Sequence, residues 1–439
     1  MSSPNRREFL KGAALMSGAL ALSPRDAAAQ ERPPNVVLII SDDQGWTDYG
    51  FMGHPTIQTP RLDKLASESV VFTRGYVTAP LCCPSLASMV TGLWPHQHKI
   101  TSNDPPRVRG ERGWGPERLK LRFEVHAHID KVATIPRLLA KKGYLSHQSG
   151  KWWLGHYSRG GFTHGMTHGD PKRGGRHGDA GLTIGRKSMK PIFDFIDAAG
   201  GKPFFIWYAP FLPHSPHNPP ERLLKKYKDK TPSIHIARYW AMCEWFDETC
   251  GQLLDYLDKK GLRENTIVLY VCDNGWIQRP NSGGFAPRSK RSRFDGGVRT
   301  PIMVRWPGKA KPRRDETTLA SSIDLAPTIL AAAGLQPTKD MQGVNLLDEK
   351  ALAARSTVYG GAFTHDAVDI NDPAKNLEWR WCVSGWWKLC LPHPPNVRNA
   401  APELYNLEND PHENTNLAAK HPDKVKELRA LLDAWWKPA

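Results

Sequence analysis

Three short apolar runs along the chain lead directly into polar residues. The run VVLII (36–40) leads to a pair of aspartates, TIVLYV (266–271) leads to Asp-Asn, and KPFFIWYAPFLPH (202–214) ends in a histidine. Continuous runs of β-branched and other apolar residues predict strands that are buried on both faces, as in a parallel sheet. Each strand would deliver its polar end residues to one edge of that sheet.

Segments with a helical spacing of apolar residues alternate with these strands. The two clearest are TIPRLLAKKG (134–143) and ARYWAMCEWFDETCGQLLDYLDKKG (237–261). Strands that alternate with helices are typical of an α/β fold with a large, mostly parallel central sheet, whose ligands bind at the carboxyl ends of the strands. Residues 104–131 and 157–187 are rich in Gly, Arg and His with weak periodicity, so we expect long loops over the site there.

The character of the chain changes after residue 347. Short Trp-rich segments follow, and the chain ends in an amphipathic pattern from His421 to Trp436. We therefore predict a catalytic domain over residues 30–347. A smaller C-terminal α+β domain would follow over residues 348–439, with a short antiparallel sheet and a terminal helix.

The first 29 residues carry the features of a twin-arginine signal peptide. The pair Arg6-Arg7 precedes a short apolar stretch from Gly12 to Leu22, and AAAQ supplies a small-residue cleavage site after Ala29. Such a signal would engage the twin-arginine translocase and place the mature protein in the periplasm or outside the cell. A short amphipathic helix is the alternative interpretation of this stretch.

The chain is strongly basic. Its formal net charge is +16, and cleavage after Ala29 would remove four basic and two acidic residues, which leaves +14. A basic balance favours anionic partners such as sulfated or phosphorylated polysaccharides through long-range steering. No nucleic-acid-binding motif accompanies the charge, so we expect no nucleic acid as a partner. No later segment approaches the roughly 18 unbroken apolar residues that cross a bilayer, so we expect no stable membrane insertion.

Seven cysteines are an odd number, so at least one thiol stays unpaired. Cys243 and Cys250 lie two helical turns apart, roughly 10 Å, which is too far for a disulfide. Cys382 and Cys390 flank a hairpin pattern and are candidates to pair, although the turn does not place them opposite one another. The expected free thiol is Cys82.

Cys82 opens the stretch CCPSLASMVTG (82–92), whose pattern predicts a turn that enters a helix. A cysteine at a helix N-terminus has its thiolate stabilised by free N–H groups, which favours reactivity. The alternative is a buried pair of small apolar residues. The stretch by itself leaves both interpretations open.

Polar residues at two predicted strand ends form a candidate metal site: Asp42, Asp43, Asp273 and Asn274. Adjacent buried carboxylates repel one another unless a cation lies between them, and oxygen donors suit Ca²⁺ or Mg²⁺. Capping of the helices that follow is the alternative role for each pair.

Seven motifs follow one another along the chain from about Pro34: SDDQG, CCPSLASMVTG, GKWWLGH, PHSPH, CDNG, KRSRFDGGVRTP and ELYNLENDPHENTNLA. Together they resemble the motifs of the formylglycine-dependent sulfatases, members of the alkaline-phosphatase-like superfamily. The resemblance implies an alkaline-phosphatase-like α/β sandwich and the hydrolysis of sulfate esters. It also implies a sulfated carbohydrate or another sulfate ester as substrate, and a formylglycine-generating enzyme as partner.

The resemblance also assigns roles to individual residues. Cys82, two positions before Pro84, would be oxidised to formylglycine, whose hydrate attacks sulfur. The implied ligands of Ca²⁺, with Mg²⁺ the less favoured ion, are Asp42, Asp43, Cys82, Asp273 and Asn274. The residues implied to hold the sulfate oxygens and to help the leaving alcohol depart are Lys151, His214 and Lys290, with His217 either on the substrate side or purely structural.

Two residues depart from the family pattern. Leu86 stands where Arg usually follows C-x-P-S, and Trp153 stands where the family usually has the His of GKWH. Leucine carries no charge, and an indole N–H cannot act as a base. The chain is thus a weakened relative or an active variant that uses another base, for which His96, His98 and His156 are candidates. We favour the active variant.

The main hypothesis is a secreted sulfatase that acts on a sulfated carbohydrate. An Arg-rich loop at Arg107, Arg109 and Arg112 favours a polyanionic glycan. A phosphodiesterase or phosphonate hydrolase on the same fold is the second hypothesis. A non-catalytic binder of sulfated glycans is the third, because 16 tryptophans offer stacking surfaces, although core packing accounts for most of them.

Overall fold

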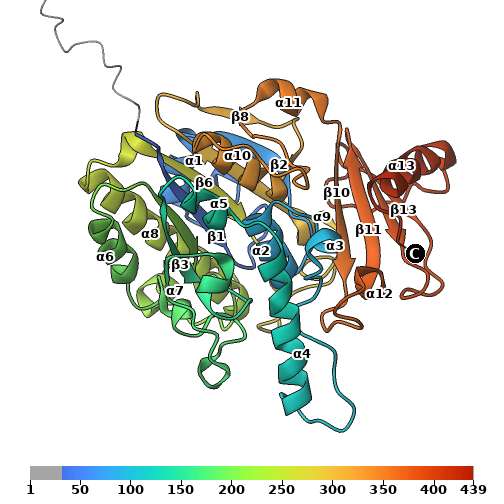
Figure 1. Ribbon diagram of the computed structural model, residues 1–439. Helices are drawn as coiled ribbons and strands as arrows, with labels where there is room; N and C mark the ends of the chain where they lie inside the picture. Colours follow the sequence, from blue (N-terminus) through green and yellow to red (C-terminus); the bar gives the residue numbers. More distant parts are fainter. Residues whose placement is uncertain (1–31, 439) are drawn as a thin grey trace, which may run out of the picture. The chain divides into compact units, whose positions relative to one another are not determined.

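The three apolar runs are adjacent strands of one large sheet (Figure 1). The computed structural model describes residues 32–438, so the predicted signal peptide lies outside the described residues. β1 (Asn35–Ser41) pairs in parallel with β5 (Phe204–Ala209) on one side and with β6 (Thr266–Cys272) on the other. Every residue of these three strands is buried, as the continuous apolar runs predict.

Nine strands of the described residues form the large sheet. Besides β1, β5 and β6 they are β2 (Val70–Tyr76), β3 (Leu145–Gly150), β4 (His164–Gly165), β7 (Arg299–Arg305), β8 (Arg313–Asp315) and β9 (Ala320–Ser321). The order is β4-β3-β5-β1-β6-β7-β2-β8, with β9 paired to β2. β7 runs antiparallel to β6 and β2, and the other pairs are parallel. The predicted α/β fold with a mostly parallel central sheet is confirmed.

Helices cover both faces of the large sheet. The α-helices of the described residues are α1 (Pro60–Ser67), α2 (Cys82–Thr91), α3 (Pro95–His98), α4 (Pro116–Ala127), α5 (Ile135–Ala140), α6 (Lys190–Ala198), α7 (Glu221–Tyr227), α8 (Ile234–Lys259), α9 (Asp295–Val298), α10 (Leu325–Ala332), α11 (Glu349–Ala354), α12 (Pro373–Asn376) and α13 (Pro422–Trp435). Val36 and Leu38 of β1 belong to the core formed with α2, α5 and α10, whereas Val37 and Ile39 belong to the core formed with α1, α6 and α8. The two helices predicted between the strands are confirmed as α5 and α8.

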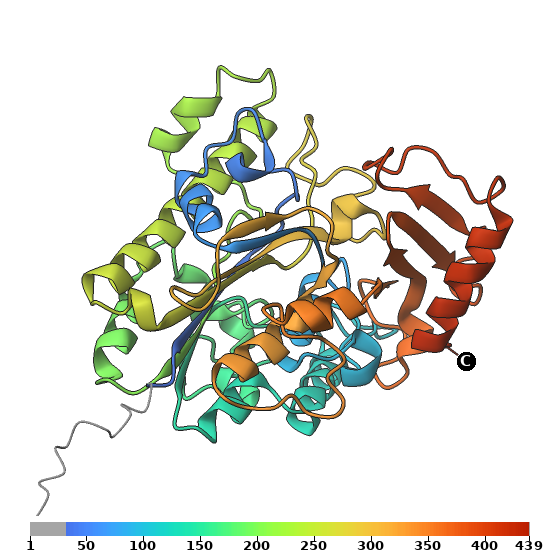
Figure 2. The same cartoon turned by 90° about the horizontal axis from the view of Figure 1, so that it is seen from above.

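A second, smaller sheet follows in the chain, and Figure 2 shows it beside the large one. It consists of β10 (Thr357–Phe363), β11 (Leu377–Ser384), β12 (Trp387–Pro392) and β13 (Glu403–Asn406), paired antiparallel in chain order. Leu428 and Leu432 of α13 pack on the leucines of one face of this sheet. The predicted short antiparallel sheet and terminal helix are confirmed, and the domain boundary after residue 347 stays a prediction.

A buried ion cluster joins the small sheet to the segment before β7. Lys388 of β12 is fully buried, and its Nζ lies 2.7 Å from Asp295 Oδ1 and 2.9 Å from Glu413 Oε1. Asp295 opens α9, five residues after Lys290, and its backbone N–H donates to Glu413 Oε2 at 2.6 Å. Because two buried carboxylates share one ammonium group, the cluster ties α9 to β12.

The prediction of a loop over residues 104–131 is wrong for the second half of this segment, which forms α4 and the short 3-10 helix η2 (His128–Lys131). The buried residues of α4 are Arg122 and His126. A helix whose buried face is polar shows no apolar periodicity, and the pattern therefore missed it. Residues 157–187 are the expected long loop, interrupted by β4 and by three short 3-10 helices: η3 (Tyr157–Gly160), η4 (Pro171–Arg173) and η5 (Asp179–Thr183).

All seven cysteines lie in the described part of the chain, and all are buried and unpaired. The register of β11 and β12 places Cys382 and Cys390 one position out of step, so their side chains point to opposite faces of the small sheet. The pairing of these two cysteines considered from the sequence is therefore wrong. Cys243 and Cys250 lie unbridged along α8, as their spacing predicts.

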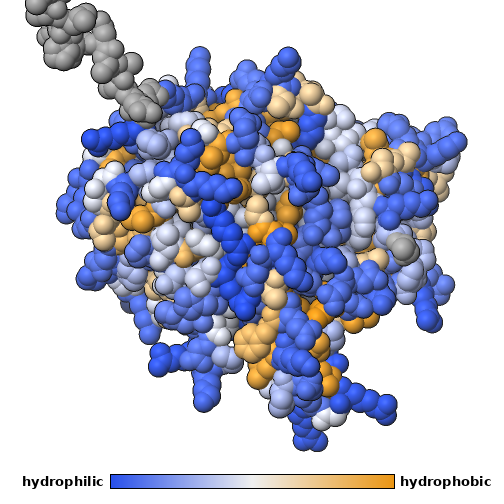
Figure 3. Space-filling view, in the orientation of Figure 1, coloured by the Kyte–Doolittle hydropathy of each residue, from blue (hydrophilic) through white to orange (hydrophobic). Residues whose placement is uncertain are grey.

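Within residues 32–438, none of the helices combines the length and the apolar character needed to span a bilayer. The longest, α8, has 26 residues, of which about half are buried against the core. The face of the molecule seen in Figure 3 is covered mostly by hydrophilic residues, with apolar residues in scattered groups.

Candidate active site

The polar residues that follow the parallel strands meet at one edge of the large sheet. They are Asp42 and Asp43 after β1, Lys151 after β3, His214 after β5, and Asp273 and Asn274 after β6. The carboxyl ends of parallel strands lie side by side, so residues far apart in the sequence come together. The backbone N–H of Asp43 donates to Asp273 Oδ1 at 3.1 Å, and Asn274 Nδ2 donates to Asp43 Oδ1 at 2.7 Å.

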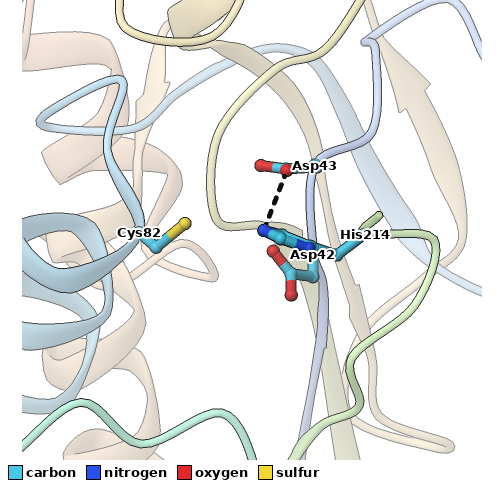
Figure 4. A group of neighbouring side chains, drawn as sticks. All are labelled: Asp42, Asp43, Cys82 and His214. Atoms are coloured by element: carbon cyan, nitrogen blue, oxygen red, sulfur yellow. Dashed lines mark ion pairs between the residues drawn. The ribbon is translucent and has the colours of Figure 1, made fainter. Parts of the chain in front are cut away.

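Cys82 reaches this edge from the first turn of α2. Its side chain is buried, and Figure 4 shows it pointing toward the two aspartates and His214. One side-chain ligand atom from each of these four residues lies within 4.8 Å of the others. The start of α2 is held by Asn103, whose side-chain oxygen accepts a hydrogen bond from the Cys83 N–H at 2.9 Å. The loop after β2 thus delivers a sulfur atom to the strand ends.

Two lysines contact this sulfur. Lys151 Nζ lies 3.1 Å from Cys82 Sγ and 2.7 Å from Asp42 Oδ1, and Lys290 Nζ lies 3.5 Å from the sulfur and 2.6 Å from Asp43 Oδ2. Burial disfavours the charged form of each lysine, but the surrounding carboxylates outweigh burial and raise the pKa of both. Two ammonium groups therefore converge on one cysteine.

The reactive-thiolate interpretation of Cys82 is wrong. Burial raises the pKa of its thiol to about 12, although the ammonium groups of Lys151 and Lys290 oppose the shift. Desolvation therefore outweighs the favourable charges of the two lysines. Cys82 is a buried, protonated thiol.

Three buried oxygen atoms at this edge have no hydrogen-bond partner among the described residues: Asp42 Oδ2, Asp273 Oδ2 and Asn274 Oδ1. Burial raises the pKa of Asp42 and Asp273, and neighbouring carboxylates add to the shift. Buried oxygen atoms without a partner are costly unless a cation binds them, and carboxylate and amide oxygens are the donors that Ca²⁺ prefers. The donor set therefore fits the ion that the sequence predicts.

His214 contacts both the carboxylate and the lysine side of the site. Its Nδ1 donates to the backbone oxygen of Ser215 at 2.5 Å, which leaves Nε2 as an acceptor 3.4 Å from Lys290 Nζ. Figure 4 draws the 3.3 Å contact of Nε2 with Asp43 Oδ2. Burial lowers the pKa of His214 well below its usual range, and the two lysines add to the shift. The imidazole is therefore neutral, and this contact is not an ion pair.

A cavity of about 300 Å³ opens beside Cys82. Its lining includes Cys82, Trp153, Arg176, His177, His214 and Lys290. A small pocket with several cations in its wall suits a small anionic group. His217 is not part of this lining and packs instead against Tyr239 and Trp276.

Two family models match the chain. The one described as Sulfatase matches residues 34–335, and the one described as N-sulphoglucosamine sulphohydrolase, C-terminal, matches residues 283–435. The chain belongs to the sulfatase family. This sulfatase is a sulfuric ester hydrolase, as the resemblance implies.

Relatives of the sulfatase align with it over most of its length. N-acetylgalactosamine-6-sulfatase of Canis lupus familiaris is 31% identical over 408 residues, which cover 82% of this chain and 74% of that protein. Arylsulfatase A of Bos taurus is 30% identical over 492 residues, which cover 94% and 88%. The crystal structure of Ps i-CgsB in complex with k-i-k-neocarrahexaose has a TM-score of 0.72 at 22% identity and covers 93% of this chain and 94% of that one. This last likeness shows the fold alone.

The two residues that depart from the family pattern lie in different surroundings in this sulfatase. Leu86 is buried in the apolar core, so it brings no charge to the site. Trp153 lines the pocket, and its indole N–H has no hydrogen-bond partner among the described residues. The pocket wall is therefore aromatic at the position where the resemblance implies a histidine.

None of the three histidines considered as replacement bases lines the pocket of the sulfatase. His98 is hydrogen-bonded within the core, His96 stacks on the end of the C-terminal helix, and His156 holds a surface turn. A different histidine, His177, does line the pocket. It lies edge-on to Trp153, with 4.7 Å between the ring centroids.

Arg176 and His177 were missed as site residues by the sequence analysis. The Arg176 guanidinium donates to His177 Nε2 at 2.6 Å. Burial, together with the charges of Lys151 and Arg176, lowers the pKa of His177 to about 2, so the imidazole is neutral. The only signal in the sequence was a cluster of basic residues, KRGGRHG (172–178), inside the long loop predicted over residues 157–187.

Proposed function

We propose that this sulfatase removes sulfate from a sulfated carbohydrate of the glycosaminoglycan type, with Cys82 converted to formylglycine and Ca²⁺ bound at the strand ends. The convergence of two ammonium groups on the sulfur of one buried cysteine carries the proposal. A protonated thiol gains little from two cations, whereas a sulfate ester bound at that point needs positive charge around its oxygens.

The implied metal ligands are Asp42, Asp43, Asp273, Asn274 and the modified Cys82. When bound, Ca²⁺ and the formylglycine hydrate would supply an activated hydroxyl for attack on sulfur. The chain orients the ligands in advance. Asn274 donates its amide N–H to Asp43, which leaves the amide oxygen of Asn274 without a partner.

Lys151 and Lys290 would bind the sulfate oxygens. Both contact the sulfur of Cys82, so an ester at this position has its anionic oxygens within reach of both ammonium groups. Negative charge that develops on these oxygens is then stabilised by donors that are already in place. The raised pKa of each lysine keeps it charged at neutral pH.

His214 would protonate the leaving alcohol. The charges of two lysines are among the causes of its low pKa. A bound sulfate ester brings negative charge that offsets those lysines, so the pKa of His214 rises when substrate binds. His214 Nε2 would then take up a proton from solvent and pass it to the leaving oxygen, while Lys290 keeps its charge.

The net charge and the relatives favour an anionic carbohydrate as substrate. The chain has a formal net charge of +16, and a relative is named for the 6-sulfate of N-acetylgalactosamine. A polymeric glycan of this kind lies outside the cytoplasm, which agrees with export by the twin-arginine translocase to the periplasm or beyond. Export of the folded chain would follow the conversion of Cys82 by a formylglycine-generating enzyme.

Peptide mass spectrometry of Cys82, in protein from its native host, tests the proposal. We expect an aldehyde oxygen in place of the sulfur, and faster turnover of an aryl sulfate than of the matched aryl phosphate. A phosphodiesterase or phosphonate hydrolase would show the reverse preference. An unmodified thiol together with no turnover would contradict the proposal and favour a non-catalytic binder of sulfated glycans.

His177 is expected to serve as the base that Trp153 cannot be, because a bound sulfate group offsets the nearby cations and raises the pKa of the imidazole. His177→Ala should leave release of the alcohol nearly intact and slow the release of sulfate by about a hundredfold, a typical contribution of a general base. Stopped-flow assay of a chromogenic aryl sulfate should then show a burst of alcohol followed by slow turnover. Trp153→His in the same variant should recover part of the rate.

His164→Ala is the matched control, because His164 is exposed and does not line the pocket. It should turn over like the parent without a burst. If His177→Ala behaves in the same way, then His177 is not the base.

A further inference from the structure

A larger cavity, of about 710 Å³, adjoins the catalytic pocket. Arg176, Arg291 and His365 line both cavities, so the two spaces meet at these side chains. We call the larger one the arginine cleft, because Arg107 and Arg118 line it as well. A ligand in the catalytic pocket that is longer than one sulfate group therefore has a charged space to extend into.

Two segments far apart in the sequence form the walls of the arginine cleft. One leads into α4 and carries Trp114 and Arg118, and the other follows β10 and includes His365. In Figure 1, α4 descends from the catalytic body beside the start of the small sheet. The backbone N–H groups of Asn103 and Asp104 both donate to the backbone oxygen of His365, at 3.0 and 3.2 Å. These bonds fix the two walls to each other.

Three arginines of the cleft are already paired. Arg176 makes two hydrogen bonds of 2.6 Å to Asp104, whereas Arg107 at 2.5 Å and Arg118 at 3.6 Å contact Asp366. Because arginines neutralise the carboxylates of Asp104 and Asp366, these two residues are poorly suited to bind a metal cation. With Arg291 included, the lining carries four arginines against the three carboxylates of Asp104, Asp366 and Glu378, and this balance favours an anion.

Arg291 supplies a positive charge that forms no direct ion pair, although Glu378, which also lines the cleft, interacts with it electrostatically. Its side chain is exposed, and among the described residues it has no ion pair and no side-chain hydrogen bond. Its φ of +68° lies in the left-handed region, which is unusual for an arginine. Arg291 directly follows Lys290, and its backbone N–H is held by Pro80 at 2.9 Å. This backbone puts a guanidinium without a direct ion pair where the two cavities meet.

Two more donors in the cleft lack partners. Arg118 Nε and Thr364 Oγ1 are buried and have no hydrogen-bond partner within the described part of the chain. The Arg118 guanidinium stacks on Trp114, 4.4 Å from its ring centroid, and this stacking limits the orientations that it can take. Unmade hydrogen bonds of buried donors are costly, so a ligand with several oxygen acceptors suits this wall better than an apolar one.

We propose that the arginine cleft binds a second anionic group of the saccharide whose sulfate ester occupies the catalytic pocket. This group is a sulfate or a carboxylate, and Arg291 is its main contact. The inference rests on the proposed function, because it takes the reacting ester to lie at Cys82. This contact gives the sulfatase a preference for multiply charged saccharides over singly sulfated ones.

Three probes test the inference and separate the two sources of negative charge. N-acetylgalactosamine 6-sulfate carries one sulfate, N-acetylgalactosamine 4,6-disulfate carries a second sulfate on the same ring, and the chondroitin 6-sulfate disaccharide carries a uronate carboxylate on the next ring. We expect kcat/KM for at least one doubly charged probe to exceed that for the single sulfate by roughly tenfold, a typical gain from a charged hydrogen bond. The probe that gains identifies the group that the cleft binds.

Arg291→Gln and Arg429→Gln form the matched pair of variants. Arg291→Gln should lower kcat/KM for the preferred doubly charged probe about tenfold more than for the single sulfate. Arg429 is an exposed arginine of α13 that lines neither cavity, and Arg429→Gln should leave the ratio between the probes as it is in the parent. Equal loss on all probes, or an unchanged ratio in Arg291→Gln, would overturn the inference.

Binding separates a failure of this inference from a failure of the proposed function. Calorimetric titration of the three probes into Cys82→Ala protein, with and without Arg291→Gln, measures the preference without turnover. A preference that Arg291→Gln removes supports the cleft even if the parent protein hydrolyses none of the probes. Turnover of the probes with no preference in either assay would leave the proposed function standing and overturn the inference.

Discussion

Replacing Asp273 with alanine is expected to abolish sulfate-ester hydrolysis and to remove the part of the thermal stability that depends on Ca²⁺. Asp273 Oδ2 is one of the three buried oxygen atoms without a partner, so the variant removes a donor from the implied metal site. In the parent, Ca²⁺ at a hundred times its Kd should stabilise the fold by about 2.7 kcal/mol, and EDTA should reverse the effect. Calorimetric melting with Ca²⁺ and with EDTA, beside an aryl sulfate assay, measures both.

Asp229→Ala is the control for this experiment, because it removes an exposed carboxylate outside the site. It should keep both the turnover and the response to Ca²⁺. Asp42→Ala should behave like Asp273→Ala. A parent protein that melts at the same temperature in Ca²⁺ and in EDTA, together with full turnover by Asp273→Ala, would show that the metal assignment is wrong.

Lys388→Met is expected to lower the free energy of unfolding by about 3–5 kcal/mol, the usual cost of leaving a buried charge without its partner. The variant removes the single ammonium group between Asp295 and Glu413, both of which are almost fully buried. Denaturation in urea measures the loss. Lys260→Met removes a contact to Asp197 at the surface and should change the stability little.

The same variant should change how stability depends on pH. Burial raises the pKa of Glu413 from 4.5 to about 7, although Lys388 opposes the shift. Between these two values the folded state binds more protons than the unfolded state, so this group makes the protein less stable as the pH rises through that window. Without Lys388 the decline should extend to higher pH.

Glu413→Gln should restore part of the stability of Lys388→Met, because it removes one of the two carboxylates left without a cation. An unchanged pH profile, or a loss as small as that of Lys260→Met, would contradict the role given to this cluster.

The strand ends could be predicted because their signals are local in the sequence. The run VVLII (36–40), which is followed by Ser41 and the two aspartates, is apolar at every position, which is a property of a strand covered on both faces. Sheet geometry then brings these aspartates to Asp273 and Asn274, more than two hundred residues away, without knowledge of any side-chain packing. The candidate metal site follows from these two steps.

The pocket wall could not be predicted in this way. His177 reaches Trp153 through a long loop whose path depends on contacts made after folding, and no periodicity marks it. α4 buries Arg122 and His126 rather than apolar residues, so the usual signal of a helix is missing. The high pKa of Cys82 also depends on how deeply α2 is covered, which the sequence around the cysteine does not reveal.

The ion cluster of Lys388, Asp295 and Glu413 limits how parts of this enzyme can be exchanged with those of its relatives. In a chimaera whose C-terminal half comes from a related sulfatase, the lysine and the glutamate of that half would have to make the same contacts with Asp295. A mismatch there would release α9, and Lys290 lies only five residues before it. Crossover points for chimaeric enzymes therefore belong before residue 290, so that Lys290, α9 and β12 all come from one parent.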